Sequence, residues 1–194
     1  MPCGRKIARP VHFAAPRSTY LWSAAHLSRP CERQASTSRI IGRREHDGCK
    51  NSHTDDAQIR ELIDSWAKAI RAKDINAVMS HLGAGILLFD LAPPLQYRGA
   101  DAYRKSLQEW FATFQGDVGY EIRELSITAG DVVAFSHSLN RITGKRTNGV
   151  ETDVWVRATV CYHKVNGAWI VAHEHASVPL YMDGSGRAAI DLKP

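Results

Sequence analysis

The spacing of apolar residues changes along this chain, and the change restricts the fold more than any other feature of the sequence. Between positions 54 and 70 apolar residues recur at steps of one, three and four, which is the spacing of a helix with one buried face. After position 118 they recur at alternate positions in long segments, which is the spacing of strands. Helices followed by strands, rather than alternating with them, predict an α+β fold.

Three helices, one short strand and four long strands are expected from these patterns. Thr54 or Asp55 is placed to cap the first helix, and Asp74 to cap a short second one. The third helix is expected from Asp101 to Phe114. Strands are expected at 86–91, 118–128, 132–141, 150–164 and 168–179. A turn at Asn148-Gly149 is expected to join the third of these to the fourth, and a turn at Asn166-Gly167 the fourth to the fifth. We therefore expect a curved antiparallel sheet wrapped around three N-terminal helices.

The first 52 residues differ in composition from the rest of the chain. They hold ten Lys and Arg against three acids, which leaves 15 of the 25 basic and 17 of the 20 acidic residues for 53–194. Since 1–52 also lacks a helical or alternating apolar period, we predict a disordered basic tail there and one domain at 53–194. Whether the tail is a targeting segment, a sequence upstream of the true start or plain disorder stays open. No nucleic-acid binding is expected, because the domain itself has no basic excess.

The apolar segments and the cysteines bear on location. No uninterrupted apolar segment approaches the roughly 20 residues that a membrane-spanning helix needs, and segments such as 85–89 are short, so no membrane segment is expected. The four cysteines, at positions 3, 31, 49 and 161, show neither C-x-x-C nor zinc spacing. Reduced thiols and a cytoplasmic location are therefore expected.

Alternation along the last two strands predicts the polar wall of a pocket. Arg157 and Thr159 share one face of the segment 150–162, and His173 and His175 share one face of the last strand. If the two strands pair through the turn between them, these four side chains come together as a pocket wall. Glu174 points the other way in this scheme, which favours a structural or interface acid.

Asp90 is the candidate acid–base residue. It follows the apolar segment 86–89, and a carboxyl buried there would have its pKa raised toward the range useful for a general base. The alternative is a solvent-facing aspartate before the turn at Pro93-Pro94. His173 and His175 are candidates for proton transfer or substrate orientation, and as an i, i+2 pair they could also bind a metal ion with Asp90 as third ligand.

Several short motifs, in this order, resemble the SnoaL-like, ketosteroid-isomerase-like branch of the nuclear-transport-factor-2-like superfamily. They are the sequence AKDI at 72–75, YRGAD at 97–101, NGAWIVAHEHASVP at 166–179 and AAIDLKP at 188–194. The resemblance covers about residues 55–194. It implies a cone-shaped sheet around an apolar cavity, no metal, no cofactor, and a homodimer paired through the sheet face.

The resemblance also suggests roles for three positions. In ketosteroid isomerases an aspartate at the end of the first strand removes a proton beside a carbonyl, while a helix tyrosine and a protonated sheet aspartate stabilise the enolate. Asp90 matches the base, but Trp66 stands at the tyrosine position and Thr159 near the sheet aspartate. Losing one such donor typically costs about 100- to 1,000-fold in rate, so steroid isomerisation itself is not implied.

The leading hypothesis is a protein that binds an apolar small molecule and acts as an isomerase, cyclase or dehydratase. Asp90, His173 and His175 would be catalytic, and the substrate-binding candidates are Trp66, Trp110, Arg157 and Thr159. The alternative is a non-catalytic binding or oligomerisation module, since 167–175 also resembles the association domain of calcium/calmodulin-dependent kinases. A third alternative, epoxide hydrolysis, requires a second acid facing Asp90 across Arg157, and the sequence offers no clear candidate.

Overall fold

The computed structural model describes residues 48–194, with side chains described from Thr54 onward. Residues 1–47 of the predicted tail lie outside this range, and residues 48–52 belong to a helix. Within the described residues, no helix is both long and apolar enough to cross a membrane.

Within residues 48–194, three helices precede or interrupt the sheet: α1 (Gly48–Arg71), α2 (Ile75–Ser80) and α3 (Ala100–Ala112). The predicted cap of α1 at Thr54 or Asp55 is wrong, because the helix already begins at Gly48. The predicted cap of α2 is confirmed, since the Asp74 carboxylate accepts a hydrogen bond from the backbone N–H of Ala77 at 3.0 Å.

In the part of the chain that the structure describes, six strands form one open sheet in the order β2-β1-β6-β5-β4-β3. Their bounds are β1 (Leu82–Phe89), β2 (Tyr97–Arg98), β3 (Gly119–Ala129), β4 (Val133–Lys145), β5 (Glu151–Val165) and β6 (Ala168–Ser177). The α+β class is confirmed, and β3 to β6 pair antiparallel as expected. The sheet is nevertheless mixed, because β1 runs parallel to β6. A parallel pair is possible here since a long connection, not a hairpin, separates β1 from β6 along the chain.

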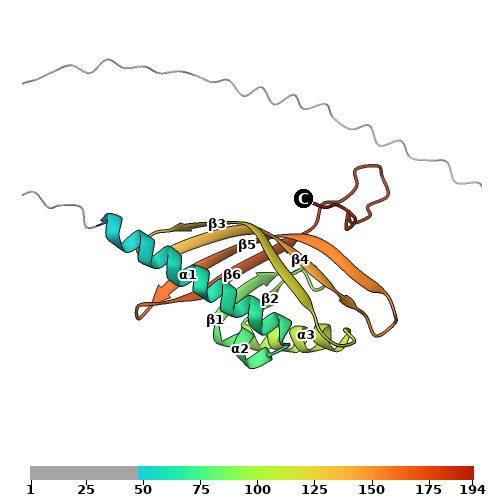
Figure 1. Cartoon of the computed structure of the whole chain (residues 1–194), viewed down its shortest axis with the longest axis horizontal. Helices are drawn as coiled ribbons and strands as arrows, with labels where there is room; N and C mark the ends of the chain where they lie inside the picture. The colour runs from blue at the N-terminus through green and yellow to red at the C-terminus, as the bar shows by residue number, and fades with distance from the viewer. Residues whose placement is uncertain (1–47) are drawn as a thin grey trace, which may run out of the picture. The chain divides into compact units, whose positions relative to one another are not determined.

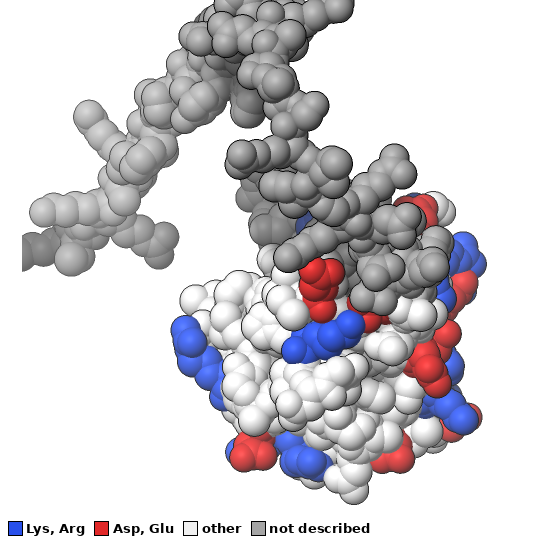
Figure 2. All heavy atoms as spheres, turned by 90° about the vertical axis from the view of Figure 1, so that its left-hand side faces the viewer, with Lys and Arg blue, Asp and Glu red and all other residues white. Residues whose placement is uncertain are grey.

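The helices lie on one face of the sheet (Figure 1). The apolar side of α1 packs against β3 and β6, while α3 packs against β1 and β2. The fully buried side chains of the core come from both layers and include Ile59, Ile70, Val78, Ile86, Leu88, Val118 and Tyr162. On the face of the domain seen in Figure 2, acidic and basic side chains are interspersed around an uncharged centre.

Asp55 fastens α1 to the sheet. It is only 4% exposed, and its carboxylate accepts hydrogen bonds from the Lys164 ammonium group and, at 3.1 Å, from the indole N–H of Trp169. The bond from Lys164 is the main cause of a lowered pKa for Asp55, against the opposing effect of burial. This network fixes α1 over β5 and β6.

A bulge at Ala172 interrupts the alternation of β6. Val171 pairs with Tyr162 and His173 pairs with Cys161, so Ala172 has no partner on β5. The extra residue reverses which positions face the helices. Val171 faces them before the bulge, and Glu174 faces them after it.

Candidate functional site

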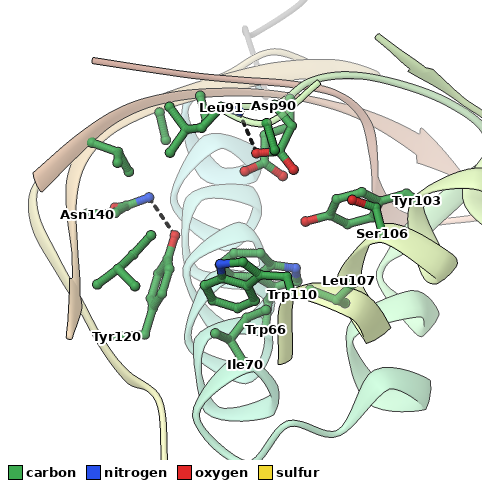
Figure 3. A pocket seen from close by; sticks show the side chains of 16 residues that line it. Trp66, Ile70, Asp90, Leu91, Tyr103, Ser106, Leu107, Trp110, Tyr120 and Asn140 are labelled. Atoms are coloured by element: carbon green, nitrogen blue, oxygen red, sulfur yellow. Dashed lines mark hydrogen bonds between the residues drawn. The ribbon is translucent and has the colours of Figure 1, made fainter. Parts of the chain in front are cut away.

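A cavity of about 130 Å³ lies between the helices and the sheet. Side chains from α1, α3, β3, β4, β5 and β6 form its walls, together with the residues that follow β1. Asp90 and Leu91 lie at one end in Figure 3, with Trp66 and Trp110 at the opposite end. Tyr103 and Ser106 lie on one side of the cavity between these ends, and Tyr120 and Asn140 on the other.

Asp90, directly after β1, is a partly buried residue in the cavity wall. One of its carboxylate oxygens accepts a hydrogen bond from the backbone N–H of Leu91 at 2.6 Å. Burial raises the pKa of Asp90 above its ordinary value, and this hydrogen bond only partly opposes the rise. Of the two placements considered for Asp90, the structure has the one that faces the cavity.

Glu174, on β6, is a second carboxyl group in the same cavity. It pairs with Leu88 of β1, two residues before Asp90, so the two acids come from neighbouring strands. Burial, and then repulsion from the Asp90 carboxylate, raise the pKa of Glu174 to about 7. Glu174 is therefore close to half protonated at neutral pH.

No basic side chain balances these two acids. The cavity wall contains no Lys, Arg or His, and neither acid forms an ion pair with any other residue in the described part of the chain. A buried carboxylate without a counter-ion is costly, which is why both pKa values move upward.

Two tyrosines supply hydroxyl groups to the cavity. The Tyr120 hydroxyl oxygen accepts a hydrogen bond from the Asn140 side-chain amide at 2.8 Å, which leaves its own O–H able to donate. Tyr103 is 8% exposed, and Figure 3 shows its hydroxyl pointing into the cavity. Burial and then the Glu174 carboxylate raise the pKa of both tyrosines well above the ordinary value, so both remain neutral donors.

Two of the predicted substrate-binding residues, Trp66 and Trp110, line the cavity. The Trp66 indole lies edge-on to the Tyr120 ring, with 5.2 Å between the ring centroids. Aromatic walls of this kind are typical of pockets for flat apolar ligands.

The other four predicted residues do not line the cavity, and this expectation is corrected. Arg157, Thr159 and His175 are exposed, and the register that pairs Thr159 with His175 places the group on the opposite face of the sheet. Nδ1–H of His173 donates to the backbone oxygen of Leu87 at 2.7 Å. For the histidines the reason is the bulge at Ala172, because strict alternation would have turned both toward the helices. Arg157 and Thr159 point away because the apolar face of β5, with Val156 and Ala158, lines the cavity.

This placement also removes two of the alternatives. Asp90 and His175 both line a hollow beside residues 91–96, but residues 54–194 contain no group of three or more His, Cys, Asp or Glu suited to metal binding. The second acid needed for epoxide hydrolysis does exist as Glu174. Arg157, which would stand between the acids, points away from them.

Sequence reasoning missed Glu174, Tyr103, Tyr120 and Asn140 as cavity residues. The helical spacing of Tyr103 predicted burial but not a hydroxyl aimed at a ligand. For Glu174 a signal was present: a charged residue between Ala172 and Ala176 has no large neighbours on its own strand face. Small neighbouring residues are compatible with a bulge that turns the acid inward, but alternation alone places Glu174 on the face away from the helices.

The domain is similar in sequence and fold to known proteins. The family model for the SnoaL-like domain matches residues 59–181. An NTF2-like protein of unknown function from Pseudomonas putida is 32% identical with a TM-score of 0.68, covering 74% of this chain and 99% of that one. A ketosteroid isomerase-like protein from Erwinia carotovora is 24% identical with a TM-score of 0.55, covering 62% and 93%.

A proposed dehydratase of the NTF2-like family from Streptomyces avermitilis is 15% identical with a TM-score of 0.59, covering 67% of this chain and 99% of that one. At this identity the likeness concerns the fold alone. No curated protein sequence matches the chain. The matched domain spans most of the described residues, and the chain belongs to the SnoaL-like family.

Proposed function

We propose that this protein is an enzyme that binds an uncharged apolar molecule and moves a proton at a carbon beside a carbonyl group. Isomerases, cyclases and dehydratases of this kind need no cofactor, only a base and a donor to the carbonyl oxygen. The observation that carries the proposal is the presence of two carboxyl groups, Asp90 and Glu174, with raised pKa values in one apolar cavity.

The two acids suit different roles. Asp90 acts as the base: its carboxylate takes the proton from carbon, and the electron pair of the C–H bond moves toward the carbonyl oxygen. Glu174, with a pKa of about 7, retains a proton that it can donate to that oxygen as negative charge develops. An isomerisation is completed when Asp90 returns its proton to a different carbon and the oxygen returns its proton to Glu174. In a dehydration the C–O bond of a hydroxyl group on the next carbon breaks, that hydroxyl takes the proton from Asp90 and leaves as water, and Glu174 regains its proton as the carbonyl forms again.

The neutral hydroxyls of Tyr103 and Tyr120 add further donors to the cavity. Trp66 and Trp110 supply the apolar surface against which a ring can stack. In this scheme Glu174 and the tyrosines take the oxyanion role that the sequence resemblance suggested for Trp66 and Thr159. Two proteins that share this fold are named as a dehydratase and as ketosteroid isomerase-like, which is consistent with the proposed chemistry.

The experiment measures proton abstraction directly, without knowledge of the natural substrate. Cyclic ketones such as 2-tetralone and cyclohexenone are incubated with the protein in D₂O, and exchange of the protons beside the carbonyl is followed by NMR. We expect the wild type to accelerate exchange of at least one ketone, and Asp90→Asn to reduce this acceleration at least about 100-fold.

Asp131→Asn is the matched control, because Asp131 is an exposed aspartate in the turn between β3 and β4. It should exchange ketones at the wild-type rate. Equal exchange by wild type and Asp90→Asn would rule out Asp90 as the base. Absence of exchange with every ketone, in a protein that assembles into oligomers, would favour the non-catalytic module instead.

A further inference from the structure

A second, smaller compartment of about 40 Å³ adjoins the cavity on the other side of Trp66. Trp66, Asn140 and Glu174 line both spaces, so these three side chains form the boundary between them. Leu62 and Ile122 are among the apolar side chains that close the smaller space. We call the two spaces the outer and inner compartments.

The inner compartment has a polar strip within its apolar walls. The hydroxyls of Ser136 and Tyr162 are hydrogen-bonded to each other at 2.9 Å, and Ser138 donates to the side-chain oxygen of Asn140 at 2.8 Å. Ser136 is 3% exposed and Tyr162 is 1% exposed, so neither is a surface group. All four of these side chains line the inner compartment.

Counting donors shows that this strip has hydrogen bonds left to make. Ser136 and Tyr162 carry one O–H each and use only one between them, so one O–H remains to donate. The Asn140 amide uses one N–H on Tyr120 and has a second. The Ser138 oxygen can still accept. A group that both donates and accepts would satisfy this set.

Charge and size narrow the ligand further. Neither compartment is lined by a basic side chain, and Glu174 borders both, so an anionic substituent is excluded by repulsion and desolvation. The inner space has room for roughly three water molecules, and therefore for a substituent of two or three heavy atoms. A hydroxyl on a short carbon arm fits these limits.

We propose that the inner compartment is a binding subsite for a short hydroxyl-bearing arm of an uncharged ring compound, and that Trp66 limits the length of that arm. The ring occupies the outer compartment, where the proposed function places the reacting carbonyl beside Asp90. The subsite thus rests on the proposed function for the ring's position, while its test measures binding alone.

The test compares ligands that differ only in the arm. Dissociation constants are measured by NMR titration for 2-tetralone and for analogues with a methyl, hydroxymethyl or 3-hydroxypropyl group on the aromatic ring. We expect the wild type to bind the hydroxymethyl analogue about 3- to 10-fold more tightly than the methyl analogue, the effect of one added hydrogen bond. The hydroxypropyl analogue, too long for the space, should bind more weakly than 2-tetralone.

Three variants connect these affinities to the subsite. Ser138→Leu fills the inner compartment and should abolish the preference for hydroxymethyl over methyl, while 2-tetralone keeps its affinity. Tyr162→Phe removes a hydroxyl without adding volume and should reduce the same preference. Trp66→Leu removes the partition and should allow the hydroxypropyl analogue to bind at least about tenfold more tightly than it binds the wild type.

Ser126→Leu is the matched control for Ser138→Leu, because it makes the same change at an exposed position of β3. It should bind every analogue as the wild type does.

Equal binding of the methyl and hydroxymethyl analogues to the wild type would overturn the subsite. So would a preference that survives in Ser138→Leu, or failure of every ring compound to bind at millimolar concentration. If the preference is found but no ketone exchanges in D₂O, only the proposed proton transfer fails.

Discussion

Asp90 and Glu174 are two acids in one apolar space with no cation between them. Each ionisation loses hydration energy, and the second also meets the charge of the first, so the two carboxyls titrate as a coupled pair. At neutral pH, with Glu174 close to half protonated, the pair therefore carries less negative charge than two isolated carboxylates would. One acid in each protonation state is what combined base and donor chemistry requires.

The raised pKa of Glu174 makes the protein's stability depend on pH. In the unfolded chain this carboxyl loses its proton near pH 4.5, whereas in the folded chain it does so near pH 7. Between these values the folded state holds more protons, so the free energy of unfolding falls as pH rises, by about 3 kcal/mol in total. Glu174→Gln should remove this fall, which urea unfolding at pH 4.5, 6 and 8 would measure.

The informative quantity is the difference between wild type and variant, because Asp90 and Asp55 also change stability with pH, in opposite directions. Glu151→Gln, at an exposed position of β5, should keep the wild-type pH dependence. A Glu174→Gln protein whose stability follows the wild type at every pH would contradict the raised pKa.

At the scale of elements, period analysis identified all three helices and the four long strands, because their apolar faces pack against each other. It could not find the bulge at Ala172, since a bulge depends on pairing with neighbouring strands rather than on the residues of β6 alone. That single inserted position reversed the predicted orientation of His173, Glu174 and His175. For Asp90 the sequence left a buried and a solvent-facing placement open, because the apolar end of β1 is local in sequence whereas the helices that complete the cavity are not.

The attachment of α1 to the sheet was also beyond sequence reasoning, because Asp55 and Lys164 are more than a hundred residues apart. Asp55 looked like a helix cap, since aspartate near the start of a helical pattern often has that role. Its actual partners become evident only when β5 and β6 pair and bring Lys164 and Trp169 together.

Asp55→Ala should destabilise the fold by about 2–3 kcal/mol. The substitution leaves the Lys164 ammonium group and the Trp169 indole N–H without their acceptor in a partly buried setting. Denaturant unfolding at pH 7 measures the effect.

Asp56→Ala is the matched control on the next residue of α1. Asp56 forms an exposed ion pair with Arg60, with 3.5 Å between Oδ2 of Asp56 and a guanidinium nitrogen of Arg60. Removing the Asp56 carboxylate should therefore lower the free energy of unfolding by less than about 0.5 kcal/mol. Equal destabilisation by the two substitutions would show that the Asp55 network does not fasten α1.

At the scale of the whole molecule, the sheet has one face covered by helices and one without them (Figure 1). On β4 the alternation that turns Ser136 inward turns Val133 and Phe135 outward, where they are 55% and 45% exposed. Apolar side chains on an open sheet face favour burial against a partner. They support the homodimer that the sequence resemblance implied, which stays a prediction.

Light scattering after size exclusion tests this directly. At micromolar concentration we expect a mass twice the 21.6 kDa of one chain, and Phe135→Glu should shift the population toward monomer. Leu95→Glu, a charge at a 95% exposed residue outside the sheet, should leave the dimer intact. A monomeric wild type would refute the prediction.

In the proposed mechanism a protonated and an ionised carboxyl share the cavity near neutral pH. ¹³C NMR of the side-chain carboxyl carbons of Asp90 and Glu174 from pH 3 to 9 reports both protonation states. We predict that Glu174 titrates near pH 7 and that Asp90→Asn lowers this midpoint, because the repelling charge is gone. A Glu174 carbon that titrates near 4.5 in both proteins would contradict the account.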